Sequence, residues 1–159
     1  MIKESEQNIA HMEYAIHLAK KALGQTHPNP MVGAVIVEGG KVVAEGYHQK
    51  SGEKHAEIIA LDSYTGTPKA DTTLFITLEP CSTEGRTGAC TNAIINSGIK
   101  HVVIGAVDPN PNHAGAGVKL LESAGISVQV GVLEEACREM NLIFNHWIVE
   151  NRPLCALKI

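Results

Sequence analysis

The sequence lacks both a long apolar segment and a cluster of basic residues. Hydrophobic residues make up 44% of the chain, but no run of them approaches the roughly 20 residues that a membrane-spanning helix needs. The 13 Lys and Arg residues against 17 Asp and Glu residues give a formal net charge of -4. No basic stripe of the kind that binds nucleic acid is present. We therefore expect neither a membrane nor a nucleic-acid partner, although a phosphorylated small molecule is compatible with this charge.

Cysteine is also scarce, with four residues in the chain. Residues 1–6 are polar and acidic, unlike the start of a secretory signal peptide. Disulfides persist mainly in secreted proteins, so a metal-binding pair explains two of these cysteines better than a disulfide does. We expect a protein of the reducing cytoplasm.

The first part of the chain predicts a helix followed by a hairpin. The length of 159 residues suits one domain with a full core. We expect residues 1–159 to form a single domain, because no repeat, low-complexity segment or linker divides them. Apolar residues at helical spacing predict a helix over 9–23. Two apolar segments, 32–37 and 41–47, flank the turn Glu38-Gly39-Gly40 and predict an antiparallel pair of strands.

After the hairpin, helical and strand patterns alternate. Helices are expected over 55–61, 90–97 and 118–124, and strands over 73–78, 102–107 and 126–130. Apolar residues over 133–147 predict a last long helix, which Trp147 would pack down. Such alternation implies parallel strands joined by helical crossovers. The sequence thus predicts an α/β fold, a three-layer α/β/α sandwich with a mixed sheet of about five strands.

Two short segments carry side chains suited to a metal. His55-Ala56-Glu57 stands at the start of one expected helix, and Cys81 and Cys90 stand between an expected strand and the next helix. A catalytic zinc site uses three nitrogen or sulfur ligands and leaves a fourth position for water, which His55, Cys81 and Cys90 satisfy. The positive ends of helix dipoles would favour the thiolate form there. Glu57 is then a carboxylate beside the metal that does not bind it.

This set of residues is suited to hydrolytic deamination. Zinc lowers the pKa of a bound water to about 7, so hydroxide is available at neutral pH. Glu57 can take a proton from that water, pass it to a ring nitrogen and then protonate the leaving amine. His-x-Glu followed by Pro-Cys and a second cysteine is typical of zinc deaminases, although the segment Ser82 to Ala89 is longer than usual. A structural zinc site would need a fourth ligand, such as His48, Cys137 or Cys155.

Further motifs accompany these residues in a fixed order. They lie at residues 26–37, 46–48, 77–82, 85–87 and 108–111. Together with His55-Ala56-Glu57 they resemble the deaminase domain of the bifunctional riboflavin biosynthesis protein RibD, within the cytidine deaminase-like superfamily. The resemblance covers nearly the whole chain, and the long spacing between Cys81 and Cys90 also matches that family.

The resemblance implies a substrate and a role for each site residue. The implied reaction is zinc-dependent deamination of 2,5-diamino-6-ribosylamino-4(3H)-pyrimidinone 5′-phosphate at the ring carbon that bears the 2-amino group. By position, Glu57 matches the catalytic proton shuttle. The residues that match the Zn²⁺ ligands are His55, Cys81 and Cys90. The residues that match substrate contacts are Asn29, His48, Arg86 and Asn110. The resemblance also implies a homo-oligomer, either a dimer or a tetramer.

The chain departs from the RibD pattern in the loop between the cysteines and at its end. Thr83 stands where the family usually has histidine, and Gly88-Ala89 stands where it usually has Pro-Pro. The chain reaches Ile159 soon after a segment that resembles the family's junction into a reductase domain, so we expect that domain to be absent and no NADPH-dependent reduction. Two alternatives stay open: a deaminase of another base, nucleoside or nucleotide (cytidine, guanine or adenosine type), and a non-catalytic zinc-stabilised binding module.

Overall fold

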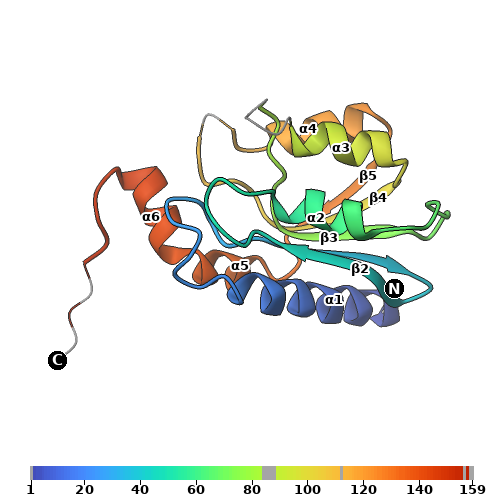
Figure 1. The fold of residues 1–159 in the computed structure, drawn as a ribbon, viewed down its shortest axis with the longest axis horizontal. Coiled ribbons are helices and arrows are strands. Elements are labelled where there is room, and N and C mark those ends of the chain that lie inside the picture. The colour runs from blue at the N-terminus through green and yellow to red at the C-terminus, as the bar shows by residue number, and fades with distance from the viewer. Residues whose placement is uncertain (1, 84–88, 112, 156, 158–159) are drawn as a thin grey trace.

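The computed structural model describes residues 2–83, 89–111, 113–155 and 157. Five strands form one sheet in the order β2-β1-β3-β4-β5, with helices on both faces (Figure 1). The strands are β1 (Gly33–Glu38), β2 (Lys41–Tyr47), β3 (Thr73–Leu78), β4 (His101–Ala106) and β5 (Ser127–Val130). The helices are α1 (Ile2–Lys20), α2 (Ala56–Ser63), α3 (Cys90–Ser97), α4 (Ala116–Ser123), α5 (Glu134–Met140) and α6 (Leu142–Glu150). The predicted three-layer α/β/α sandwich with a mixed sheet is confirmed.

The sheet is mixed because a hairpin forms one side of it and crossovers form the other. β1 pairs antiparallel with both β2 and β3, whereas the β3–β4 and β4–β5 pairs are parallel. The hairpin turn places Gly39 and Gly40 at φ values of 55° and 73°, which glycine adopts without steric cost. Since β3 and β4 are parallel, the segments that leave their carboxyl ends meet at one edge of the sheet.

Two apolar clusters fill the space between the three layers. α1 and α5 cover one face of the sheet, and α2, α3 and α4 cover the other (Figure 1). Ile36 and Leu74 pack in the cluster beneath α2, while their neighbours Val35 and Phe75 pack in the cluster beneath α1. Strands covered on both faces have continuous apolar sequences instead of alternating ones, which is the pattern seen in β3.

α1 begins before the helix expected over 9–23 and ends at Lys20, after which residues 21–25 form turns. It lies directly on the backbone of β1. A Cβ added to Gly33 would lie 2.0 Å from the carbonyl oxygen of Ala15. Glycine at this position therefore sets how closely the first helix approaches the sheet.

The single long helix expected over 133–147 is wrong, because Asn141 interrupts it. The Asn141 side-chain amide makes two hydrogen bonds to the backbone of Met31. Its Oδ1 accepts the Met31 N–H at 2.8 Å, and its Nδ2 donates to the Met31 carbonyl at 2.8 Å. Its backbone has a φ of -108°, outside the helical range. The residue thereby separates α5, which packs on the sheet, from α6.

We expect Asn141→Ala to lower the free energy of unfolding by about 1–3 kcal/mol, because it leaves the Met31 N–H and carbonyl without partners. Urea denaturation monitored by circular dichroism measures this loss. Asn145→Ala is the matched control, since the Asn145 amide makes one exposed hydrogen bond, to the carbonyl of Arg138. Equal losses in the two variants would contradict the role given to Asn141.

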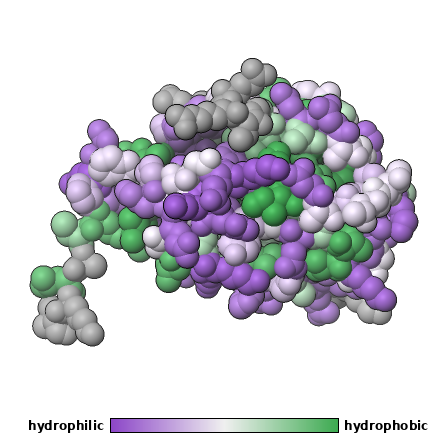
Figure 2. All heavy atoms as spheres, in the orientation of Figure 1, coloured by the Kyte–Doolittle hydropathy of each residue, from purple (hydrophilic) through white to green (hydrophobic). Residues whose placement is uncertain are grey.

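α6 projects from one end of the molecule (Figure 1), and Figure 2 shows hydrophobic surface at that end. None of its residues is buried, and its exposed apolar side chains are Leu142, Ile143, Trp147 and Val149. Trp147 is 44% exposed and lines a surface groove with residues of the 23–31 loop, so its expected role in packing down the last helix stays a prediction. Among the helices that the structure describes, none has the length and apolar character needed to cross a membrane.

Candidate metal centre and active site

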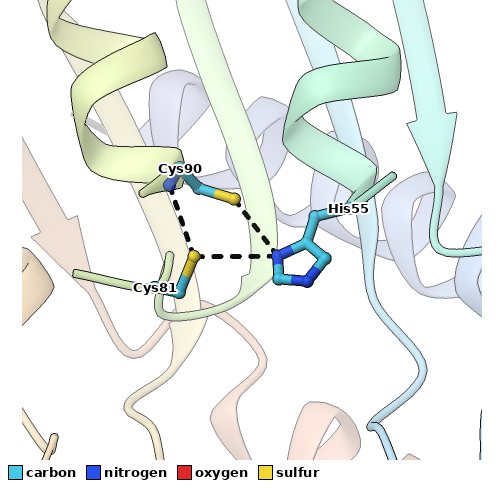
Figure 3. A group of neighbouring side chains, drawn as sticks. All are labelled: His55, Cys81 and Cys90. Atoms are coloured by element: carbon cyan, nitrogen blue, oxygen red, sulfur yellow. Dashed lines mark hydrogen bonds between the residues drawn. The ribbon is translucent and has the colours of Figure 1, made fainter. Parts of the chain in front are cut away.

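Two helix N-termini and one strand end bring His55, Cys81 and Cys90 together (Figure 3). His55 directly precedes α2, Cys81 lies in the segment after β3, and Cys90 is the first residue of α3. The position of α2 is fixed by close packing against β2, because a Cβ on Gly46 would lie 2.5 Å from the carbonyl oxygen of Ala56. Residues far apart in the sequence are thus held at one point by the fold.

The geometry of these three side chains fits a zinc ion. The Nδ1 atom of His55 lies 3.2 Å from the Cys90 sulfur and 3.7 Å from the Cys81 sulfur. All three potential ligand atoms lie within 4.8 Å of one another. Tetrahedral zinc with bonds of about 2.1 Å to nitrogen and 2.3 Å to sulfur places its ligand atoms about 3.6–3.8 Å apart. The 3.7 Å spacing between His55 and Cys81 matches this value, and the 3.2 Å spacing between His55 and Cys90 is a few tenths of an ångström shorter. The donor set of one imidazole and two thiols is one that zinc prefers.

The side chains considered as a fourth protein ligand are engaged or distant. His48 uses both ring nitrogens, with Nδ1 bonded to the Lys54 carbonyl at 3.1 Å and Nε2 to the Asn29 amide at 3.2 Å. Cys137 packs in the cluster beneath α1 and α5, and Cys155 is exposed beyond α6. With three available ligands, the site matches a catalytic zinc centre better than a structural one, which has four.

The two thiols shift one another's pKa in opposite directions. The Cys90 side chain holds the pKa of Cys81 well below its usual range, and the His55 ring and the Cys90 backbone N–H at 3.3 Å act in the same direction. The same contact with Cys81, together with burial, raises the pKa of Cys90. The contact with Cys81 also raises the pKa of His55. A cation would replace the proton that the two sulfurs share, because metal ligands bind deprotonated.

Glu57 is the buried carboxylate of the site. It lies in the first turn of α2, two residues after His55, and is 4% exposed. Burial raises the pKa of its carboxyl to about 7. With this pKa the group can exchange a proton near neutral pH, and a divalent cation nearby would favour its charged, proton-accepting form.

A cavity of about 220 Å³ opens beside these residues. Its wall includes His55, Glu57 and Cys81 together with the hydrogen-bonded pair Asn29 and His48. His48 is 3% exposed, and its ring lies edge-on to the ring of His55 at 5.5 Å between centroids. Pockets for drug-sized ligands occupy about 300–1,000 Å³, so this cavity has room for a heterocyclic base with its substituents outside.

The remaining predicted contacts lie at the rim or outside the described part of the chain. Asn110 follows β4 and donates its backbone N–H to the Asp108 carboxylate at 2.8 Å, but the cavity wall does not include it. Arg86, with Gly88, lies outside the described residues. Thr83 and His113 both line a small adjoining pocket of about 60 Å³.

Asp108 and Phe144 are among the cavity-wall residues that sequence reasoning did not assign to the site. Asp108 is half-buried, and burial raises the pKa of its carboxyl. Its motif, Asp108 to Pro111, was recognisable in the sequence, but which of its side chains faces the cavity was not. Phe144 reaches the cavity from α6 only because Asn141 breaks the last helix. No local sequence pattern indicates that placement.

The fold and the site place the protein in the cytidine deaminase-like class of α/β proteins. Residues 5–106 match the family model described as the cytidine and deoxycytidylate deaminase zinc-binding region, and the chain belongs to this family. The match covers both His55 and Cys90, the first and last of the three clustered residues.

Similar proteins carry riboflavin biosynthesis names, which confirms the resemblance to RibD. RibD of Aquifex aeolicus is 52% identical over 158 residues, covering 99% of this chain and 44% of that protein. The diaminohydroxyphosphoribosylamino-pyrimidine deaminase of Buchnera aphidicola is 47% identical over 131 residues, covering 82% of this chain and 88% of that protein. A Thermotoga maritima deaminase/reductase structure superposes with a TM-score of 0.88 at 44% identity, covering 94% of this chain and 43% of that one. The chain thus spans less than half the length of its RibD relatives and most of the Buchnera protein.

Proposed function

We propose that residues 1–159 form a single zinc-dependent deaminase domain that acts on a phosphorylated diaminopyrimidine in riboflavin biosynthesis. The observation that carries this proposal is the buried Glu57 carboxylate, which lines a base-sized cavity together with His55 and Cys81 of the three-residue cluster. The names of the relatives support the substrate class, since the Buchnera protein matches along most of its own length. The proposed substrate is 2,5-diamino-6-ribosylamino-4(3H)-pyrimidinone 5′-phosphate.

The residues of the site have distinct proposed roles. His55, Cys81 and Cys90 would hold a zinc ion, which supplies Lewis-acid activation of water when bound. Glu57 accepts one proton from the water and delivers it to the ring nitrogen next to the reacting carbon. It then accepts the second proton from the oxygen added to that carbon and passes it to the departing amino group. Burial of Glu57 keeps this proton exchange close to neutral pH. The outcome is replacement of a ring amino group by oxygen with release of ammonia.

Recognition of the base is proposed to come from the side chains around the cavity. Asn29 presents its amide oxygen and remaining N–H to a pyrimidine edge. His48 borders the base and fixes that amide, because its ring nitrogens bind the Asn29 amide and the Lys54 carbonyl. Asp108 offers carboxylate oxygen to the amino groups of a diaminopyrimidine. Asn110 and Arg86 are proposed to contact the ribose phosphate outside the cavity, where a guanidinium can bind phosphate through two hydrogen bonds.

Three expectations from the sequence stay predictions within this proposal. The first is a cytoplasmic location, and the second is a homo-oligomer, dimer or tetramer. The third is that the binding partner is a small molecule and not nucleic acid, consistent with the net charge of -4.

The test is release of ammonia from the diaminopyrimidine nucleotide by the zinc-loaded protein, with cytidine, guanine and adenosine compounds in parallel. We expect turnover of the nucleotide at least about 100-fold faster than of the others, because contacts to polar groups that a wrong substrate lacks discriminate strongly. The dephosphorylated nucleoside is the matched control for the phosphate contact. Turnover of a cytidine, guanine or adenosine compound in preference to the nucleotide would overturn the substrate assignment, and turnover of none would favour a binding module.

A further inference from the structure

Glu79 joins the end of β3 to the loop that follows β4, and the proposed chemistry does not use it. It stands two residues before Cys81 and is 6% exposed. Its two carboxylate oxygens accept hydrogen bonds from backbone N–H groups of a distant segment. These donors are Asp108 (3.1 Å) and Gly115 (2.9 Å) on Oε2, and Gly117 (2.8 Å) and Val118 (3.3 Å) on Oε1. An ionised carboxylate offers about four acceptor sites, so its capacity is used on backbone.

Three of these hydrogen bonds, from Gly115, Gly117 and Val118, cap the start of α4. The residue before the helix is Gly115, with a φ of 77° and no side chain to accept the first N–H groups. Glu79 supplies the missing acceptor from another part of the chain, and its negative charge lies at the positive end of the helix dipole. The approach is close, since a Cβ on Gly117 would lie 2.4 Å from the carbonyl oxygen of Pro80. The start of α4 therefore rests on the segment that carries Cys81.

The fourth hydrogen bond, from the Asp108 N–H, links Glu79 to the wall of the cavity. Glu79 holds the Asp108 N–H, and the Asp108 carboxylate in turn accepts the N–H of Asn110. The turn contains Pro109 and Pro111, which have no N–H and so cannot contribute donors to a regular backbone ladder. The carboxylates of Glu79 and Asp108 therefore accept the N–H groups of this turn in place of backbone carbonyls.

We propose that Glu79 is a positioning residue. It fixes the 108–110 turn beside the cavity and next to the segment that carries Cys81. Glu79 also borders the cavity, but it acts through the turn, because its carboxylate is occupied by backbone donors. That this turn contacts the substrate, through Asp108 and Asn110, depends on the proposed function. The restraint on the turn itself does not depend on any substrate.

Glu79→Gln tests this role with little change in shape. The amide NH₂ would face N–H donors, so two of the four hydrogen bonds are lost. The NH₂ faces either the N–H groups of Asp108 and Gly115 or those of Gly117 and Val118. We expect amide hydrogen exchange at the pair that it faces to become about tenfold faster or more, in line with the loss of a bond to a charged group. We expect KM for the diaminopyrimidine nucleotide to rise by a similar factor, with kcat and zinc content close to those of the wild type.

The matched control is Leu121→Val, which loosens α4 in the core without touching the turn. Leu121 is fully buried in the cluster beneath α4. Its substitution should lower Tm while leaving KM and the exchange at Asp108 unchanged. Unchanged exchange in Glu79→Gln, equal effects in both variants, or loss of zinc would overturn the positioning role, as would an unchanged KM beside a lowered Tm. If the wild type turns over no nucleotide, the proposed function fails, and the exchange comparison alone decides whether Glu79 restrains the turn.

Discussion

Glu57→Gln is expected to lower kcat by about 10²- to 10⁴-fold, the usual contribution of a positioned acid–base group. Glutamine fills the same buried space beside the clustered ligands but cannot accept and return a proton. The effect should fall on kcat, because the proton is moved during the reaction and not on binding. Ammonia release measured at saturating nucleotide gives kcat directly.

Two controls separate this loss from damage to the site. Zinc content of Glu57→Gln should equal that of the wild type, since Glu57 is proposed to lie beside the metal and not to bind it. Glu53→Gln removes an exposed carboxylate close in sequence to α2 and should leave kcat unchanged. Turnover of Glu57→Gln at the wild-type rate, with zinc retained, would show that another group moves the proton.

The layers of the fold could be predicted because the strand segments are short, apolar and separated by a turn or by helical segments. Residues 73–78 carry adjacent apolar side chains at Leu74, Phe75 and Ile76, and the structure covers β3 with helices on both faces. The clustering of His55, Cys81 and Cys90 was also predictable, because each stands at an expected helix start or strand end. Topology of this kind brings the carboxyl ends of parallel strands to one edge, where α/β proteins bind ligands.

The parts that could not be predicted depend on contacts between distant residues. Asn141 carries a helical sequence pattern on both sides, and only its bonds to Met31 show why the helix breaks there. The inward position of Phe144 follows from that break. For Glu79 the sequence left open a group directed toward the pocket or a structural role, and its bonds to the loop after β4 appear only in the structure.

The largest loss of metal is expected for Cys90→Ser. Cys90 is fully buried, its sulfur lies 3.2 Å from the His55 ring, and its own N–H holds the Cys81 sulfur (Figure 3). A serine hydroxyl keeps the volume and the backbone contact but does not ionise at neutral pH, so it is a much weaker zinc ligand than thiolate. Zinc bound per chain, measured by atomic emission after dialysis, should fall to a small fraction of the wild-type value.

The same substitution should remove both the activity and the stabilisation that zinc gives. Activity is expected to fall at least as far as in Glu57→Gln, about 10²- to 10⁴-fold. Zinc that binds only the folded state at 100 times its Kd stabilises by about 2.7 kcal/mol, so Tm should rise on adding zinc to the wild type and stay constant in Cys90→Ser. Cys155→Ser, which changes an exposed thiol outside the cluster, should behave as the wild type does in all three measurements. Retention of zinc by Cys90→Ser together with its loss in Cys155→Ser would mean that the metal is held by a different set of thiols, and the catalytic assignment of Glu57 would fall with it.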